Sequence, residues 1–503
     1  MKIKQLPLVF GIMALFLFSC DTPVNNKSGY NGYFPPDPQS KTFRALNMVT
    51  DKYYDVPAKL LYVGERCTIW GEEASHVSPS TAHDMALTYD NTIYPRMMNV
   101  FNSGETFTEG GKVVARDPME LADYYGDGDG KLCILLLDIK DGYNGSTNTS
   151  YVGGYFSTIN LYSKGTYPNS NECDMIYVDT YPVIPGSDDS NGTLAHEMQH
   201  LMNYVITLAK RGGHSMDTWI NEGLSTSAEW VWNGKQARGR VDWYMDNKPL
   251  GLIPEGNNFY VWDNHRDNTY AILDDYATAY LFFQWLRLQA GSTNIYKEII
   301  NSTLSDYRAV TAAAGQAISS DYSSNWGLLL RDWFAANYIN APSGRYGYKN
   351  DPTLRKILIW SLSDTAGKSY SLAPGEGIYT KKTSMPAATT YIKYAGLKRT
   401  PTVGVSDTTA SGYSMLLSYN IDTRVNGSSS SCNPFSVEMA DFPGIQRDTD
   451  MSMASRSISQ GEQRRPSGPY PISAGDMLRR NGHGEEFPAL DLSKLRRGNK
   501  TDE

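Results

Sequence analysis

Histidine and cysteine are scarce in this chain, and no long block of like charge occurs in it. Seven of the 503 residues are histidine and five are cysteine. The formal net charge of −8 favours solubility and excludes nucleic acid as the expected partner. After the N-terminal segment no apolar run approaches the length of a membrane-spanning helix, which excludes a multi-span membrane protein. The 40% apolar and 12% aromatic residues indicate a globular protein with substantial cores.

The cysteines do not have the close spacing of a zinc-binding cysteine cluster, so we assign no metal to them. Besides Cys20 they are Cys67, Cys133, Cys173 and Cys432. An exported chain can form disulfides, and four cysteines allow three pairings. Free buried thiols are equally compatible with Cys133 and Cys173, because both lie in apolar, strand-like runs.

The N-terminus predicts export. Two lysines at positions 2 and 4 precede an apolar run over residues 6–18, which is typical of a signal peptide covering residues 1–19. The sequence Leu-Phe-Ser before Cys20 resembles a bacterial lipoprotein signal, with cleavage before Cys20 and lipid on its sulfur. An ordinary signal peptide cut nearby is the alternative. The lipid would anchor the protein at the outer membrane or cell surface without a span. Residues 20–40 then form a flexible stalk, rich in Asn, Gly, Pro and Ser.

The most informative motif is His-Glu-x-x-His at residues 196–200, inside a segment whose apolar residues have helical spacing. Residues four apart share one face of a helix, so His196 and His200 can direct both imidazoles at one metal ion. Glu197 follows the first histidine and can reach a water on that metal. A carboxylate base beside a metal-activated water is suited to hydrolysis. A chance match of this short pattern is the alternative.

A second helical pattern, starting near Asp217, argues against a chance match. Its Glu222 comes 22 positions after His200, enough for one helix to end, a turn to form and a second helix to begin. An antiparallel second helix would bring Glu222 beside both imidazoles. Three protein ligands with an open fourth position are typical of catalytic zinc. We therefore expect Zn²⁺ held by His196, His200 and Glu222.

Two further polar residues belong to this second helix. Glu229 lies seven residues after Glu222, on the same helical face, and can accept the spare ring N–H of a ligand histidine. A solvated or salt-bridged carboxylate is an equally good interpretation of Glu229. Asn221 either orients the substrate backbone or caps the second helix, and we favour the cap.

The residues around both motifs resemble the gluzincin metallopeptidases, and within them the hyicolysin-like group of bacterial secreted and surface peptidases. The resemblance covers roughly residues 45 to 345. It is carried by His196-Glu-Met-Gln-His200, Trp219-Ile-Asn-Glu-Gly-Leu-Ser225 and Ala228-Glu229, and by flanking segments at residues 153–157, 175–182 and 275–282.

The resemblance also bears on the donor that stabilises the oxyanion during hydrolysis. A tyrosine hydroxyl near the metal can serve, and the resemblance implies Tyr276, with Tyr280 one turn later and His265 as alternatives. Ala277 departs from the family, in which a glycine is expected, and this weakens the implication.

The order of the elements predicts an α+β protein with a zincin-like catalytic domain. Residues 41–190 have the pattern of a mixed sheet with helices, and residues 191–345 that of a helical zinc-binding part. Short alternating stretches over residues 346–445 indicate a small β domain, which binds substrate or extends the scaffold. Residues 446–503 are poor in apolar residues, and we expect them to be disordered.

Two glycine-containing segments can each be interpreted in two ways. Residues 153–157 can form an edge strand with room for an added peptide strand, or a structural bulge. The sequence Asp127-Gly128-Asp129-Gly130 hints at calcium. Because position 125 is not acidic and the terminal glutamate of an EF-hand loop is missing, we interpret this segment as a plain acidic turn.

The function that these residues predict is a surface-tethered zinc endopeptidase. Zn²⁺ is its cofactor, Glu197 its general base, a protein or peptide its substrate, and the membrane its partner through the lipid. The alternatives are a non-catalytic, adhesin-like surface protein that keeps the fold, and a zinc hydrolase with a non-peptide substrate.

Overall fold

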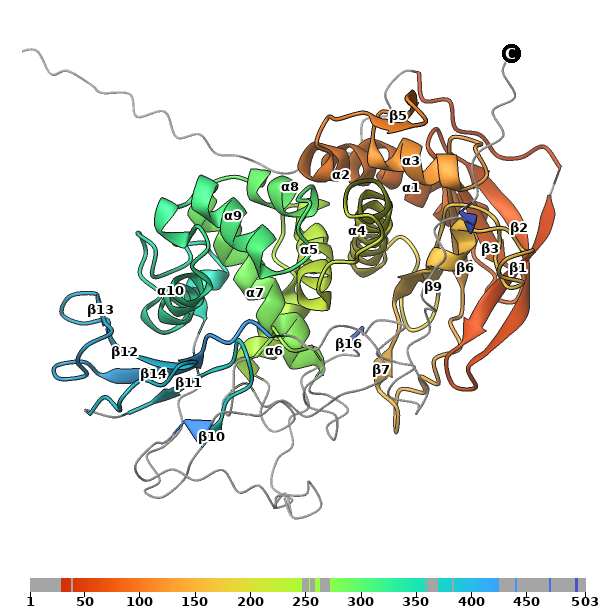
Figure 1. Ribbon diagram of the computed structural model, residues 1–503. Helices are drawn as coiled ribbons and strands as arrows, with labels where there is room; N and C mark the ends of the chain where they lie inside the picture. Colours follow the sequence, from red (N-terminus) through yellow and green to blue (C-terminus); the bar gives the residue numbers. More distant parts are fainter. Residues whose placement is uncertain are drawn as a thin grey trace, which may run out of the picture.

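The computed structural model describes residues 29–37, 39–246, 253, 258–262, 272–357, 359, 370–381, 384–424, 439–440, 470–471 and 494–495. The predicted signal peptide, Cys20, Cys432 and His265 lie outside these residues. Helices and a mixed sheet make up the described part, which confirms the predicted α+β class (Figure 1).

A six-stranded sheet forms one side of the molecule (Figure 1). Its strands, in spatial order, are β1 (Ser40–Asn47), β2 (Lys52–Val63), β3 (Cys67–Glu72), β6 (Leu132–Leu137), β9 (Met175–Asp179) and β8 (Gly154–Phe156). β3, β6 and β9 are parallel, whereas β8 pairs antiparallel with β9 at the edge. Every residue of β6 is buried, as expected for a central parallel strand covered on both faces.

Short elements pack around this sheet. They are α1 (Pro79–Thr88), a π-helix (Tyr89–Ile93), α2 (Tyr94–Phe101), the hairpin of β4 (Phe107–Glu109) and β5 (Lys112–Ala115), α3 (Pro118–Tyr125) and β7 (Ser150–Tyr151). The α1 helix is capped by Ser78, whose side chain accepts from the Thr81 N–H.

The helical half begins with the long helix α4 (Asp188–Lys210), which lies between the sheet and the remaining helices (Figure 1). The side chain of Ser187 caps α4, and Asp188 and Asp189 in its first turn complement the helix dipole. The helices that follow are α5 (Thr218–Val231), α6 (Arg238–Asp246), α7 (Ile272–Ala290), α8 (Asn294–Ile300), α9 (Tyr307–Ala317) and α10 (Trp326–Ile339).

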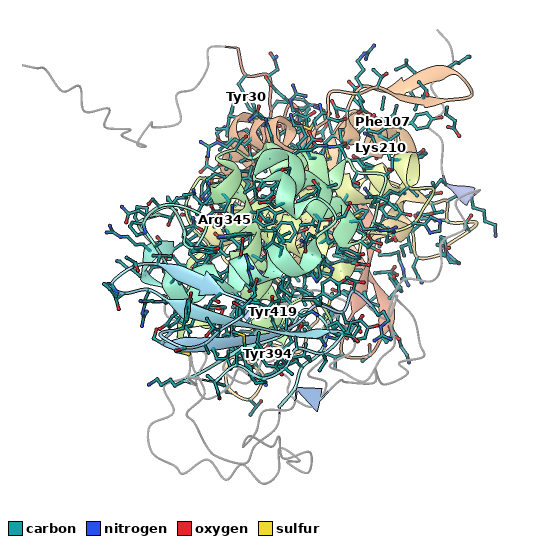
Figure 2. The ribbon with its side chains drawn as sticks, turned by 60° about the vertical axis from the view of Figure 1, so that its left-hand side comes forward. Tyr30, Phe107, Lys210, Arg345, Tyr394 and Tyr419 are labelled. Carbon is teal, nitrogen blue, oxygen red and sulfur yellow. The ribbon has the colours of Figure 1, made fainter. Side chains whose placement is uncertain are left out.

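A four-stranded antiparallel sheet follows the helices, with the order β11 (Gly377–Thr380), β14 (Met415–Asn420), β12 (Ile392–Lys398) and β13 (Gly404–Ser406). One face packs on α10, where the Tyr379 hydroxyl donates to the Phe334 carbonyl (2.8 Å). Tyr419 belongs to the main core, and Tyr394 belongs to a small separate core on the other face (Figure 2). The sheet therefore shares a core with the helical half.

Three short pieces of the C-terminal region are also described. The two-residue strand β15 (Met439–Ala440) pairs with β10 (Tyr370–Ser371), and β16 (Tyr470–Pro471) pairs with β7. Leu495 forms a bridge with Tyr162. The predicted domain boundaries and the predicted disorder of the tail stay predictions. Within the described residues, no helix combines the length and the apolar character that crossing a bilayer requires.

Candidate metal centre

Two neighbouring helices bring the three expected ligands together. α4 carries His196 and His200, and α5 carries Glu222. The Nε2 atoms of His196 and His200 lie 3.4 and 3.6 Å from Glu222 Oε2. The two imidazole rings are 4.8 Å apart and steeply inclined to each other. One nitrogen from each histidine and one oxygen from Glu222 therefore converge on a common point.

Close packing of α5 on α7 fixes the position of Glu222. Gly223 follows Glu222, and a Cβ at this glycine would lie 2.2 Å from the ring of Phe283 on α7. Only glycine allows this approach, so the backbone at Glu222 is held against a rigid helix. The carboxylate is 5% exposed, which means that its charge needs a partner inside the protein.

The donor set fits a zinc ion. Glu222 Oε2 is buried, and no described residue forms a hydrogen bond with it. Each histidine uses Nδ1 elsewhere: that of His196 lies 3.1 Å from Glu229 Oε1, and that of His200 lies 3.0 Å from Ser225 Oγ. These contacts place the ring proton on Nδ1 and leave both Nε2 lone pairs toward the centre. Tetrahedral zinc bonds of about 2.0–2.2 Å separate neighbouring ligand atoms by about 3.4 Å, close to the separations observed.

Glu229 joins the metal centre to a buried arginine. Its Oε1 accepts from Arg240 on α6 at 3.0 Å as well as contacting His196. Burial raises the pKa of Glu229, but Arg240 and His196 outweigh burial and hold the pKa below its usual range. A charged carboxylate therefore fixes the His196 ring. Arg240 follows Glu229 by 11 residues but belongs to the next helix, so helical spacing alone does not predict this contact.

Ser225 orients the His200 ring as Glu229 orients the His196 ring. This role was not predicted from the sequence. The Ser225 hydroxyl donates to the Asn221 carbonyl (2.9 Å) or to Gln199, so it can accept the His200 Nδ1–H. A signal was present in the sequence, since Ser225 lies three residues after Glu222 and hence on the same face of α5.

Asn221 does not cap the second helix, so that interpretation was wrong. α5 begins at Thr218 after the N-cap Asp217, and Asn221 lies inside the first turns. Its Oδ1 accepts from Asn203 on α4 at 2.6 Å. Asn203 Oδ1 accepts in turn from Arg211 (2.6 Å), whose guanidinium also donates to the Ile300 carbonyl. Asn221 therefore locks α4 against α5.

Glu197 lies between the metal centre and the edge strand β8. Its Oε2 accepts from the Phe156 N–H at 3.0 Å, and the residue is 7% exposed. Burial raises the pKa of Glu197, although the two histidines act against this effect. The segment at residues 153–157 thus contributes an edge strand that directly contacts the carboxylate next to the expected ligands.

The two candidate tyrosines differ in their surroundings. The Tyr280 hydroxyl donates to Gln236 Oε1 (2.6 Å) and accepts from the Ala237 N–H (2.9 Å), so it is held by the segment between α5 and α6. The Tyr276 ring is buried, with the Arg240 guanidinium 4.7 Å from its centroid and Trp262 packed edge-on. Tyr276 therefore neighbours the arginine that holds Glu229.

The charged groups of the metal centre shift one another's pKa values. Burial lowers the pKa of His196, but the adjacent Glu222 and Glu229 carboxylates outweigh burial and raise the pKa to about 10. Burial raises the pKa of Glu222, whereas His200 and His196 outweigh it and hold that pKa well below its usual range. Without a metal, the carboxylates therefore keep a proton on His196, and a bound cation would replace it.

Comparison with known proteins finds one relevant relative. The neutral metalloprotease ShpI of Staphylococcus hyicus is 29% identical to this chain over 326 residues. The match covers 63% of this chain and spans 66% of the length of ShpI. No protein-family model matches the chain.

Proposed function

We propose that this protein is a zinc-dependent endopeptidase. The observation that carries the proposal is the convergence of two imidazole nitrogens on one buried Glu222 oxygen that has no hydrogen bond among the described residues, with Glu197 adjacent. The name of the relative, a neutral metalloprotease, supports a metal-dependent peptidase. His196, His200 and Glu222 would hold the ion. When bound, zinc polarises the substrate carbonyl and lowers the pKa of water toward neutrality.

Glu197 is the proposed general base. The Phe156 N–H fixes Oε2, which leaves Oε1 to take the proton from the attacking water. Glu197 then passes this proton to the leaving amine. Burial makes the carboxylate a better base by raising its pKa, and it also keeps bulk water from competing for the proton.

The edge strand β8 is the proposed guide for the substrate backbone. It pairs with β9 on one side, and no described strand pairs with its other side, where we place an added peptide strand. Because Phe156 contacts Glu197, a peptide lying along β8 would pass directly by the general base. This arrangement favours a peptide over a small non-peptide substrate.

Tyr276 is the proposed donor to the oxyanion. Tyr280 is a poorer candidate, since its hydroxyl is held by the segment between α5 and α6, whereas Tyr276 lies beside the arginine that holds Glu229. Arg240 lies over the Tyr276 ring and also holds Glu229, so the same cation would position both the tyrosine and the His196 ring.

We propose that lipid on Cys20 tethers the protein to the outer membrane or cell surface. The basic N-terminus, the apolar run and the Leu-Phe-Ser-Cys sequence support this proposal. Labelled fatty acid should be incorporated into the wild-type chain and not into Cys20→Ala. Equal labelling of both would contradict the anchor.

Casein cleavage by the zinc-loaded protein tests the proposed activity. Cleavage should stop with 1,10-phenanthroline and return when zinc is added. An unbiased peptide library then separates a peptidase from a hydrolase of other substrates. A zinc-loaded protein that cleaves no peptide in that library would refute the proposal and favour a surface-binding role.

A further inference from the structure

Three aspartates far from the zinc ligands in the sequence form a second acidic cluster. Asp123 lies in the last turn of α3, Asp127 follows in the loop to β6, and Asp174 directly precedes β9. One carboxylate oxygen from each lies within 4.8 Å of the others. Asp123 Oδ1 also accepts from the Gly130 N–H (2.8 Å), so the loop is folded back onto α3.

Among the three aspartates, Asp174 is the one whose surroundings indicate a bound ligand. It is 1% exposed, and its Oδ1 has no hydrogen-bond partner among the described residues. A buried carboxylate oxygen without a donor is costly. Burial accordingly raises the pKa of Asp174 well above its usual range, and Asp127 adds to this effect.

The loop is shaped around this oxygen. A Cβ at Gly126 would lie 2.4 Å from Asp174 Oδ1 and 2.6 Å from the Asp174 nitrogen. The glycine therefore lets the loop backbone approach the buried carboxylate. A cavity of about 520 Å³ lined by all three aspartates adjoins the cluster, so water can complete the coordination of an ion.

Protein cations lie around the cluster without pairing directly with it: Lys41 acts against the raised pKa of Asp127, and Arg66, Arg116 and Lys131 line the adjoining cavity. None of the three aspartates forms a salt bridge within the part of the chain that the structure describes. Lys131 lies nearby in the sequence, but its Nζ donates to the Gly64 and Glu65 carbonyls, both at 2.7 Å. Three carboxylates thus face one another, and no described cation forms a salt bridge with them.

We propose that Asp123, Asp127 and Asp174 bind a calcium ion. The donors are all oxygens, which selects a hard cation over zinc. Calcium accepts six to eight oxygens at about 2.3–2.6 Å in flexible geometry, so a cluster that mixes fixed carboxylates with water suits it better than magnesium. From the sequence we expected a plain acidic turn at residues 127–130. The third carboxylate was not foreseen, because Asp174 comes from a distant segment.

The ion would join two parts of the sheet domain. Asp123 and Asp127 precede β6, and Asp174 precedes β9, which pairs in parallel with β6 (Figure 1). β9 in turn carries the edge strand β8 beside Glu197. Calcium bound here would stabilise the sheet that supports the peptidase site and would not take part in chemistry.

Thermal unfolding of the zinc-loaded protein tests the proposal without using activity. Calcium at 10 mM should raise Tm by about 3 °C, if the affinity resembles that of extracellular calcium modules near 10⁻⁴ M. Magnesium at the same concentration controls for ionic strength and should have a much smaller effect. Calorimetric titration with calcium should show one site per chain.

Three variants make the assignment specific. Asp174→Asn should abolish the calcium-induced rise while leaving the calcium-free Tm at or above that of the wild type, because it removes a buried carboxyl group whose Oδ1 has no hydrogen-bond partner among the described residues. Asp127→Asn, at an exposed position, should weaken calcium binding at least about tenfold by removing one charged ligand. Asp84→Asn, an exposed aspartate on α1, should keep the full rise. An unchanged wild-type Tm in calcium, or a full rise in both cluster variants, would overturn the proposal.

Discussion

Replacing Ser225 by alanine isolates one contact of the metal centre. The change removes the oxygen 3.0 Å from His200 Nδ1 and leaves the three ligands in place. In the variant the ring proton loses the acceptor that keeps it on Nδ1. Proton transfer to Nε2 would then compete with metal binding. Loss of such an orienting contact typically weakens metal affinity about 10- to 100-fold.

Ser227 provides a matched control on the same helix. Both serines are buried, and both hydroxyls donate to the carbonyl four residues earlier, Asn221 for Ser225 and Gly223 for Ser227. Ser227→Ala therefore loses a comparable backbone contact without touching His200. Each variant should lower the free energy of unfolding of the metal-free protein by about 1 kcal/mol.

Competition between the protein and a fluorescent zinc chelator measures the difference. We expect the zinc Kd of Ser225→Ala to rise about 10- to 100-fold, equivalent to about 1.4–2.7 kcal/mol, and that of Ser227→Ala to stay near the wild-type value. Equal zinc affinity in the two variants would refute the assigned role of Ser225.

Four further outcomes follow from the same geometry. Glu197→Gln should retain one zinc per chain and lose about 10²–10⁴-fold in kcat, because the amide cannot take the proton; near-full casein cleavage would remove its role as base. Glu222→Ala should lose bound zinc, measured by elemental analysis, and unchanged zinc would exclude it as a ligand. Tyr276→Phe should lower kcat about 10²–10³-fold with little change in zinc content, whereas Tyr280→Phe should not; equal effects would contradict the assignment. Zinc affinity should increase as pH rises through the neutral range, because zinc displaces the proton from His196, whose pKa is raised to about 10; a pH-independent Kd would contradict this competition.

The sequence was sufficient for the elements that depend on local pattern. The spacing of His196 and His200 and the apolar periodicity around them define α4, and the glycines after it allow the turn to α5. Because two antiparallel neighbours joined by a short turn must pack together, the approach of Glu222 to the histidines could also be expected. The burial of the continuous apolar strand β6 follows from the same reasoning.

Contacts between side chains of different helices or strands could not be predicted from the sequence. Arg240 reaches Glu229 across the turn between α5 and α6, and no helical periodicity continues through that turn. The meeting of Asp174 with Asp127 requires β9 to lie beside β6, which a single sequence does not specify. The cap interpretation of Asn221 was wrong because Asp217 starts the helix earlier, which leaves the asparagine free to bind Asn203.

X-ray absorption at the zinc edge tests the central claim most directly. The zinc-loaded protein should show only nitrogen and oxygen ligands at about 2.0–2.2 Å, including two imidazoles, and Glu222→Ala should change this spectrum or lose the zinc. A sulfur ligand at about 2.3 Å, or a spectrum that Glu222→Ala leaves unaltered, would contradict a centre built from His196, His200 and Glu222.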